Sequence, residues 1–317
     1  MTSSNAMRIA VFGTGGVGGY FGGRLAQAGH DVAFIARGAH EDAIRQHGLQ
    51  VESVAGDFVV EPATVAPDPA GVGTVDVILV CVKTWQVPDA ARALGPMLGR
   101  DTFVVPLQNG VEAADQIALV IGAERVVPGL CRLMSYVAAP GVIRHAAVAP
   151  DVEIGERPHR ESARVRTLHD AFAGAIGISP RISTDIDASL WTKFLFIASF
   201  SGVGALLGLA SDAMRADASA RAMLEGAMTE IAALASTRGI RLPAGTVAGA
   251  MSYVDGLPPG TTASMQRDIL EGRPSELEAQ NGAVVRLARD ASVAVPIHQR
   301  IYEALLPAES RARGRAC

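Results

Sequence analysis

Lys193 stands at the head of a long apolar run, LWTKFLFIASFS at 190–201. Burial in such surroundings lowers the pKa of a lysine toward the working pH. A lysine in that state suits the task of a general acid, which is charged before a reaction and gives up its proton during it. The alternative is a lysine at the end of a helix whose ammonium group reaches out to solvent. The run alone leaves both interpretations open.

Two further segments carry polar groups that suit a substrate site. The stretch TTASM at 261–265 holds hydroxyl groups, Ser264 among them, that could bind a carboxylate or cap a helix. The stretch RPSELE at 273–278 is expected to begin a helix. Glu276 and Glu278 could be site residues, or they could be there only because the first turn of a helix favours acidic side chains. No histidine lies in a Ser/His/Asp arrangement, and none of the seven has the spacing of a metal ligand. We therefore expect no metal site.

A glycine-rich motif follows the first apolar segment of the chain. The letters GTGGVG match the pattern G-x-G-x-x-G, with a strand expected at 7–12 and a helix expected at 17–28. The first glycine of the pattern allows a tight turn, the second lets the backbone approach a pyrophosphate, and the third permits close packing of helix on strand. Backbone N–H groups at the start of the helix would hold the phosphates. The motif predicts a dinucleotide site formed by Gly13, Thr14, Gly15, Gly16, Val17 and Gly18.

Three side chains follow expected strands, at the edge where such sheets bind dinucleotides. Arg37 comes after the strand at 31–36, where NAD sites usually carry Asp or Glu, and it favours the 2′-phosphate of NADP. Lys83 comes after a buried strand at 75–82, where it would help to hold that phosphate or the adenine, or else is a solvated charge. Asn109 suits the nicotinamide ribose or the substrate, or else a turn before glycine. NADPH is therefore the expected cofactor.

The elements that must position these residues fall into two groups. Strands and helices alternate to about residue 183, and the strand–helix–strand unit at the start implies a parallel sheet. Short β segments at 125–154 indicate antiparallel pairing, and helical periodicity dominates after 183, with a long buried helix at 187–209. The predicted fold is α/β: a Rossmann-like, doubly wound N-terminal domain at 7–183, an all-α C-terminal domain at 184–307, and tails at 1–6 and 308–317.

The composition argues against several classes of function. Of the 317 residues, 49% are hydrophobic and 19% charged, as in a well-buried globular protein of two domains. A net charge of −4 gives no basic footprint for nucleic acid or an anionic membrane. The stretch 194–210 carries no charged residue, but its glycines and serines favour a core helix over a membrane span. Three cysteines, far apart and odd in number, indicate a reducing, cytoplasmic setting without a disulfide framework.

The whole pattern resembles the ketopantoate reductase family, the 2-dehydropantoate 2-reductases, from Met7 to about Leu306. The matching pieces occur in order, and together they are more specific to the fold of the family than to its substrate. They are GTGGVGG at 13–19, Arg37, VKTWQV at 82–87, QNG at 108–110, LWTKF at 190–194, SM at 264–265, RPSELEAQNG at 273–282 and Pro296.

The resemblance implies a role for each candidate residue. Lys193 would donate the proton to the ketone oxygen, and Glu276 would act near the nicotinamide and the developing hydroxyl. Arg37 and Lys83 would recognise the 2′-phosphate end of NADPH, and Asn109 would lie where cofactor and substrate meet. The implied reaction is the NADPH-dependent reduction of a 2-oxo acid, with 2-dehydropantoate (ketopantoate) as the first substrate to test.

Two positions depart from the family pattern. Pantoate-forming members carry asparagines four and eight residues after the lysine, where this chain has Ile197 and Ser201. At helical spacing these residues share one face with Lys193, and Ile197 cannot pair a substrate hydroxyl, whose burial without a partner costs about 1–3 kcal/mol. Ser264 matches a serine that helps to bind the substrate carboxylate. The expected substrate-binding residues are therefore Lys193, Ile197, Ser201, Ser264 and Asn109.

Three functions are open at this level. The first is a ketopantoate reductase of pantothenate biosynthesis, and the second is a reductase of the same family for a less polar carbonyl compound. The third is a non-catalytic NADPH-binding sensor, against which Lys193 and Glu276 argue, because a sensor does not need a proton donor. The expected partner is a small 2-oxo acid, and a homodimer through the helical domain is suggested by analogy.

Overall fold

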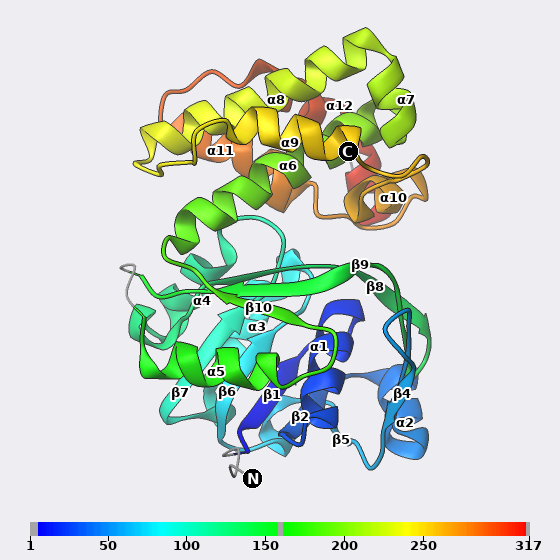
Figure 1. Cartoon of the computed structure of the whole chain (residues 1–317), viewed down its shortest axis with the longest axis vertical. Helices are drawn as coiled ribbons and strands as arrows, with labels where there is room; N and C mark the ends of the chain where they lie inside the picture. Colours follow the sequence, from blue (N-terminus) through cyan, green and yellow to red (C-terminus); the bar gives the residue numbers. More distant parts are fainter. Residues whose placement is uncertain (1–5, 158–160, 315–317) are drawn as a thin grey trace. The chain divides into compact units, whose positions relative to one another are not determined.

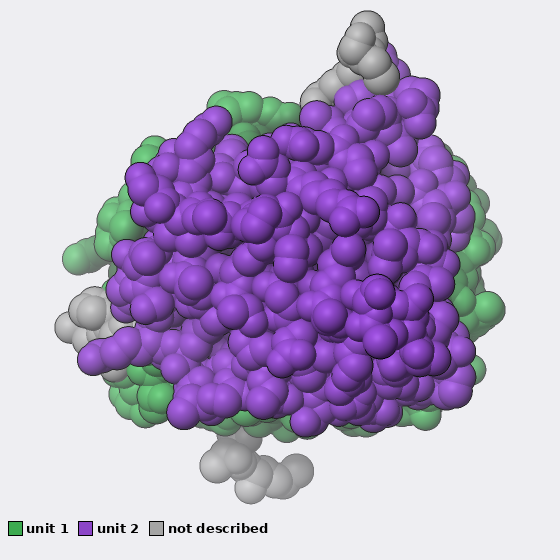
Figure 2. All heavy atoms as spheres, turned by 90° about the horizontal axis from the view of Figure 1, so that it is seen from above, with its two compact units in different colours: residues 1–108, 112–186 green, residues 109–111, 187–317 purple. Residues whose placement is uncertain are grey.

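The computed structural model describes residues 6–157 and 161–314. The chain divides into two compact units, which Figure 2 colours separately: residues 1–108 and 112–186 form unit 1, and residues 109–111 and 187–317 form unit 2. Unit 1 contains two sheets with helices, and unit 2 is helical, which is the predicted succession. The prediction puts Asn109–Val111 in the N-terminal domain. The segment belongs to unit 2 instead, because it contacts the chain around Glu276.

Unit 1 is built on a five-stranded parallel sheet of β1 (Arg8–Phe12), β2 (Asp31–Ile35), β5 (Thr64–Ala66), β6 (Val75–Val80) and β7 (Leu98–Pro106). The strand order is β5-β2-β1-β6-β7, and all neighbours are parallel. β2 and β6 flank β1, so the direction of winding reverses at β1. Ligands of open α/β sheets bind outside the carboxyl ends of the strands at such a reversal.

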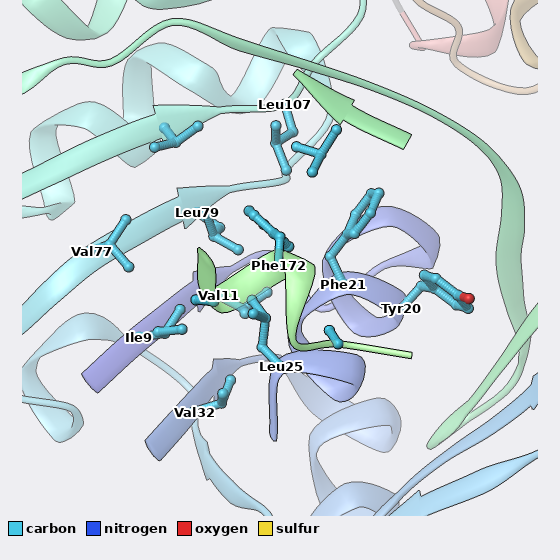
Figure 3. Close-up of a cluster of buried hydrophobic side chains, with 14 of the residues drawn as sticks. Ile9, Val11, Tyr20, Phe21, Leu25, Val32, Val77, Leu79, Leu107 and Phe172 are labelled. Carbon is cyan, nitrogen blue, oxygen red and sulfur yellow. The ribbon is translucent and has the colours of Figure 1, made fainter. Parts of the chain in front are cut away.

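Helices cover both faces of this sheet, as the doubly wound prediction requires (Figure 1). Residues of β1 alternate between the faces and join two separate apolar clusters. The first cluster lies under α1 (Gly16–Gln27) and α5 (Ala163–Ala173), and the second under α3 (Val87–Ala93) and α4 (Ala113–Ile121). Figure 3 shows the first cluster, in which Phe172 lies among side chains of β1 and α1.

A second sheet in unit 1 is mixed. The long antiparallel hairpin of β8 (Gly129–Ala139) and β9 (Val142–Ile154) has β3 (Leu49–Ser53) and β10 (Ser179–Ile182) parallel to β9, and β4 (Phe58–Val60) pairs with β3. The predicted antiparallel pairing at 125–154 is confirmed, although the strands are long. The strands at 49–60 and 179–182 were not predicted, because runs of three to five residues carry little periodicity. Shorter connections are α2 (Gly38–His47) and 3-10 turns at Pro69–Gly71, Thr84–Gln86, Gly95–Met97 and Ala123–Arg125.

Unit 2 has no strand among its described residues. Its last helix differs from the prediction of a tail after residue 307, because it continues to Ala312 and includes the buried side chain of Glu309. The helices are α6 (Ile186–Leu207), α7 (Ser211–Ala216), α8 (Ala218–Thr237), α9 (Thr246–Asp255), α10 (Ser264–Leu270), the π-helix Glu278–Gly282, α11 (Ala283–Asp290) and α12 (Pro296–Ala312).

Among the described helices, α6 alone is long and apolar enough to cross a membrane by length and composition. The mean hydropathy of its most apolar window is 1.6, and 67% of that window is buried inside the protein. Burial of this extent is what the core helix predicted at 187–209 requires.

Candidate functional site

The turn between β1 and α1 requires glycine at two positions. Gly13 has a φ of +102°, and a Cβ there would lie 2.8 Å from the backbone nitrogen of Val82. A Cβ at Gly18 would lie 2.2 Å from the carbonyl oxygen of Gly13, so only glycine lets α1 pack this closely on the turn. These are the tight turn and the close helix packing that the motif predicts.

Gly15 and Gly16 differ in what surrounds them. A Cβ at Gly15 would meet no heavy atom within 4 Å, whereas a Cβ at Gly16 would lie 2.4 Å from the carbonyl oxygen of Ser135 in β8. Packing inside unit 1 therefore requires Gly16, and Gly15 faces open space at the N-terminus of α1. The first N–H groups of a helix have no partner within it and carry the positive end of its dipole. With Val17 and Gly18 in that first turn, this space fits the pyrophosphate of a dinucleotide.

Two hydrogen bonds of Thr14 connect the turn to the neighbouring strand. Its N–H and its hydroxyl both donate to the carbonyl oxygen of Ile35 at the end of β2, at 3.2 and 3.0 Å. His40 of α2 holds the other side of Thr14. The Nδ1 of His40 accepts from the N–H of Gly141 at 2.9 Å, so Nε2 carries the proton and donates to the Thr14 carbonyl oxygen at 2.8 Å. An isolated histidine in a polar stretch gives no signal in the sequence, and only the fold identifies it.

Arg37 and Lys83 follow β2 and β6, the two strands that flank β1. β1 pairs with both in parallel register, so the two cations lie at the same edge of the sheet as the glycine turn. Arg37 is exposed, and its Nε donates to the carbonyl oxygen of Pro67 at 3.2 Å. The ammonium group of Lys83 lies 5.9 Å from the centre of the Trp85 ring, within range of a cation–π contact.

Lys83 and Lys193 are the only lysines among the 28 lysine and arginine residues of the chain. Every other basic position carries arginine, whose guanidinium keeps its charge at any pH a protein meets. A lysine amine is a compact charge that can also give up its proton. Both lysines of the chain are therefore candidate site residues. The motifs described above do not include this feature of the sequence.

Unit 2 joins Asn109 to Glu276. The Nδ2 of Asn109 donates to Oε2 of Glu276 at 3.2 Å, and Glu276 is buried, with 6% of its surface exposed. The loop approaches closely at Gly110, where φ is +95° and a Cβ would lie 3.0 Å from the carbonyl oxygen of Ala279. The structure thus brings together two predicted site residues that lie 167 positions apart in the chain.

Glu276 and Glu278 have different surroundings. Glu278 pairs with Arg286, accepts from the hydroxyl of Tyr302 at 2.6 Å, and has a side chain that is 56% exposed. Burial and the hydrogen bond to Glu278 raise the pKa of Tyr302 to about 12, so the hydroxyl remains a donor. Glu278 is therefore engaged at the surface, whereas Glu276 lies inside the unit beside Asn109.

The last helix fixes the backbone that carries Glu276. Ser275 is fully buried, and its N–H donates to both carboxylate oxygens of Glu309, at 3.1 and 3.0 Å. Its hydroxyl donates to the same carboxylate at 2.5 Å. Arg313 pairs with Glu309 and donates to the Ser275 carbonyl oxygen at 2.6 Å. The stretch predicted to be a tail thus holds a candidate site residue in place.

Lys193, Ile197 and Ser201 follow one another at intervals of four residues on α6. Lys193 and Ile197 are half-buried, whereas Ser201 is fully buried. The three residues predicted to share a face therefore differ in exposure. Lys193 and Ile197 are partly accessible to a ligand, whereas Ser201 is enclosed. The hydrogen-bond partners of Ser201 Oγ are the Ile197 carbonyl oxygen at 2.5 Å, Oε1 of Gln280 at 2.6 Å and Sδ of Met265 at 3.9 Å.

Ser264 is half-buried as the first residue of α10. The N-cap position of this helix is Ala263, so the Ser264 hydroxyl is not the helix cap that was the alternative for it. Met265 contacts Ser201, and Gln266 donates from Nε2 to a carbonyl oxygen just after α6 at 2.8 Å. These contacts hold α10 against α6 and bring Ser264 to the region of Ser201.

A π-helix at Glu278–Gly282 follows Glu276 almost directly. Within it, Asn281 donates from Nδ2 to the Ala198 carbonyl oxygen of α6 at 3.2 Å and to Nδ1 of His298 in α12 at 3.0 Å. Burial lowers the pKa of His298 to about 4, so the ring is neutral and its Nε2–H donates to a carbonyl oxygen of α8 at 3.1 Å. Single π turns often mark functional sites, and this one is tied to three helices.

No group of three or more His, Cys, Asp or Glu side chains that could hold a metal ion occurs in residues 6–157 and 161–314. Cys81 and Cys131 form no disulfide bond, and burial together with the neighbouring Cys131 raises the pKa of Cys81 well above its ordinary value. Cys317 lies outside the described residues.

The sequence matches two family models in succession. Residues 9–159 match the model described as ketopantoate reductase PanE/ApbA, and residues 185–309 match the model described as ketopantoate reductase PanE/ApbA C terminal. The chain is 31% identical to the 2-dehydropantoate 2-reductase of Nostoc sp., over 98% of this chain and 97% of that protein.

Solved structures share the fold. The crystal structure of 2-dehydropantoate 2-reductase from Geobacter metallireducens matches with a TM-score of 0.88 at 29% identity, over 95% of this chain and 100% of that one. The ternary structure of D-mandelate dehydrogenase with NADH and anilino(oxo)acetate matches with a TM-score of 0.87 at 24% identity, over 97% of this chain and 99% of that one. The second likeness is one of fold alone.

Proposed function

The chain belongs to the ketopantoate reductase family, and we propose that it reduces 2-dehydropantoate to pantoate with NADPH, as a cytoplasmic enzyme of pantothenate biosynthesis. The observation that carries the proposal is the hydrogen bond from Asn109 to buried Glu276 in the unit that also contains Lys193. A non-catalytic NADPH sensor would need the glycine turn but would have no use for this second set of residues.

The reduction places a negative charge on the ketone oxygen, which must then receive a proton. Bound NADPH supplies the hydride that the keto carbon of the 2-oxo acid accepts. Lys193 stabilises the oxygen by its charge before the transfer and then donates the proton. Glu276, held by Asn109, accepts a hydrogen bond from the new hydroxyl and orients it. The half-buried setting of Lys193 supports this role, because fewer water molecules compete for its charge.

We assign the 2′-phosphate of NADPH to Arg37 and Lys83. Both cations follow strands that flank β1, at the edge of the sheet that also carries the glycine turn. An exposed guanidinium can bind a phosphate through two parallel hydrogen bonds. The end of β2 also lacks the carboxylate with which NAD sites hold the 2′-hydroxyl.

One observation favours a second substrate class. Ile197 is half-buried one helical turn after Lys193, so an apolar side chain lies where a polar substrate group would need a partner. A reductase for a less polar 2-oxo acid is therefore the second candidate.

The test measures the oxidation of NADPH with 2-dehydropantoate and with a panel of apolar 2-oxo acids. We expect 2-dehydropantoate to give the highest kcat/KM, and we expect Lys193→Arg to lower kcat by about 10²–10⁴-fold because a guanidinium cannot give up a proton. Lys83→Arg is the same change at the other lysine, and it should move the KM for NADPH rather than kcat.

Three results would count against the proposal in different ways. A highest kcat/KM for an apolar 2-oxo acid would favour the second substrate class. An unchanged kcat in Lys193→Arg would remove the proton donor. Binding of NADPH without turnover of any 2-oxo acid would favour a sensor.

A further inference from the structure

We propose that Gln280 binds a hydroxyl group of the substrate and that Ser201 holds the Gln280 amide in position for it. The inference rests on the proposed reductase function and concerns the same substrate. Gln280 lies inside the stretch RPSELEAQNG at 273–282, but the sequence does not predict it as a site residue. Its position, its hydrogen bonds and its unpaired atom carry the inference.

Gln280 lies one helical turn after Glu276. Its N–H donates to the Glu276 carbonyl oxygen at 3.0 Å, so the two side chains share a face. Ser201 lies two turns after Lys193 on α6. The contact of 2.6 Å between Gln280 and Ser201 therefore joins the turn that carries Glu276 to the face of α6 that carries Lys193.

The Ser201 hydroxyl has one hydrogen but two close oxygen neighbours. The Ile197 carbonyl oxygen lies at 2.5 Å and the Gln280 amide oxygen at 2.6 Å, and both are acceptors. A half-turn of the amide exchanges its oxygen and its nitrogen without moving any other atom. Ser201 then donates to Ile197 and accepts from Nε2 of Gln280, so that each contact contains a hydrogen. We take this orientation of the amide as the one that the hydrogen bonds require.

The other end of the amide has no partner. Gln280 is fully buried, and the amide atom that faces away from Ser201 makes no hydrogen bond with any described residue. In the orientation that Ser201 requires, this atom is the carbonyl oxygen, which is an acceptor. A buried acceptor without a donor costs about 1–3 kcal/mol. A ligand hydroxyl close to Glu276 would supply the donor.

This assignment fits the chemistry of the proposed substrate. 2-Dehydropantoate carries a hydroxyl two carbons beyond its keto carbon, and Ile197 cannot pair it. The amide that the family pattern places on α6 is lacking here, and Gln280 offers an amide from the π-helix instead. Ser201 differs from Gln280 in its hydrogen bonds: its hydroxyl is already engaged by Ile197 and Gln280, so its role is to hold Gln280 rather than to contact the substrate itself.

The test compares two substrates that differ by one hydroxyl, 2-dehydropantoate and 3,3-dimethyl-2-oxobutanoate. The quantity measured is the ratio of their kcat/KM values with NADPH. Gln280→Met keeps a long, unbranched side chain but removes the amide. We expect it to lower the ratio about 10–100-fold, through the hydroxylated substrate alone. Ser201→Ala leaves the amide in place but unfixed, and we expect it to lower the ratio about 3–10-fold.

Gln266→Met is the matched control, because Gln266 is equally buried in unit 2 but has both amide atoms bonded within the protein. It should lower the melting temperature and leave the ratio unchanged. Equal losses for both substrates in Gln280→Met would overturn the inference, since they indicate a structural role, and so would an unchanged ratio. If Gln280→Met does not fold, an unchanged ratio in Ser201→Ala would overturn it. A wild-type protein that reduces neither compound would overturn the proposed function itself, and the inference with it.

Discussion

The side-chain amide of Asn109 donates a hydrogen bond to the buried carboxylate of Glu276 at 3.2 Å, across 167 positions of the chain. The loop that carries Asn109 can approach Ala279 closely because Gly110, which has a φ of +95°, has no side chain to lie between the loop and Ala279. The pair places an oriented carboxylate in unit 2, together with the lysine that we assign as the proton donor.

Asn109→Ala removes the donor, and we expect it to lower kcat/KM about 10–100-fold, as the loss of a hydrogen bond to a charged group would. Asn109→Asp should be more damaging, because an acceptor-only carboxylate repels Glu276. Steady-state kinetics at neutral pH measure both. Glu278→Gln is the control, since Glu278 lies at the surface with Arg286 and Tyr302, and it should change kcat/KM little. Equal activities for Asn109→Ala and wild type would contradict the role of the pair.

Alanine substitutions at two adjacent glycines should affect different properties, NADPH binding in one case and stability in the other. Gly15 has a φ of −83° and open space around a Cβ, so Gly15→Ala should fold normally and weaken NADPH at least about tenfold by filling the phosphate space. Gly16→Ala would place its Cβ 2.4 Å from the Ser135 carbonyl oxygen, so it should lose about 1–3 kcal/mol of stability. Thermal unfolding and cofactor titration separate the two effects. Normal NADPH affinity in Gly15→Ala would place the phosphates elsewhere.

Arg37→Ala should weaken NADPH about 10–100-fold and leave NADH nearly unchanged, because only NADPH carries the 2′-phosphate. The Kd values of both cofactors, measured by fluorescence at two salt concentrations, test this expectation. The loss should shrink as salt rises, since screening weakens the contact in the wild type. Equal losses for both cofactors would show that Arg37 supports the fold of the loop instead.

His298 should make the protein less stable in mild acid. Its pKa is about 4 in the folded protein against 6.5 for an ordinary histidine, so the unfolded chain binds more protons between these values. The contribution of His298 to the free energy of unfolding is complete above pH 6.5. It decreases by about 3 kcal/mol in all as the pH falls to 4.

Urea unfolding between pH 5 and pH 7.5 measures how the free energy of unfolding changes with pH, which is the slope compared below. His298→Asn keeps a donor and an acceptor without titrating, and its slope should be flatter. Glu230 accepts from the N–H groups of Ile297 and His298, and burial raises its pKa, so it acts in the opposite direction and stability from it falls as pH rises. The slope should therefore be compared in a Glu230→Gln background. An unchanged slope in His298→Asn would assign the acid sensitivity to other groups.

Deletion of residues 308–317 should destabilise unit 2 by several kcal/mol. It removes Glu309 and Arg313, leaving the buried N–H and O–H of Ser275 without an acceptor and its carbonyl oxygen without the Arg313 donor. Glu309→Gln in the full chain should cost less than the deletion, while Glu303→Gln, an exposed change on the same helix, should cost almost nothing. Chemical denaturation measures all three. A stable truncated protein would restore the interpretation of this stretch as a tail.

Local patterns predicted the parts of the fold and site that local forces dictate. The glycine turn followed from residue types within six positions, and α6 from an apolar run long enough for a buried helix. The second sheet was only partly predictable, because β3, β4 and β10 are stabilised by pairing with distant strands rather than by their own periodicity. The local sequence did not indicate the roles of His40 and Gln280, since each owes its role to partners from other elements.

The sequence by itself determined the fold class, the order of the two units and the family, and it placed Lys193, Glu276, Asn109 and the glycine turn among the candidates. These follow from spacing along the chain, which backbone geometry converts directly into turns, strands and helical faces. The tertiary structure alone decided that Asn109 joins unit 2 at Glu276, that Ser201 is enclosed against Gln280, and that α12 clamps Ser275. Such pairings depend on buried polar atoms finding partners from distant parts of the chain, and no local pattern records where those partners are.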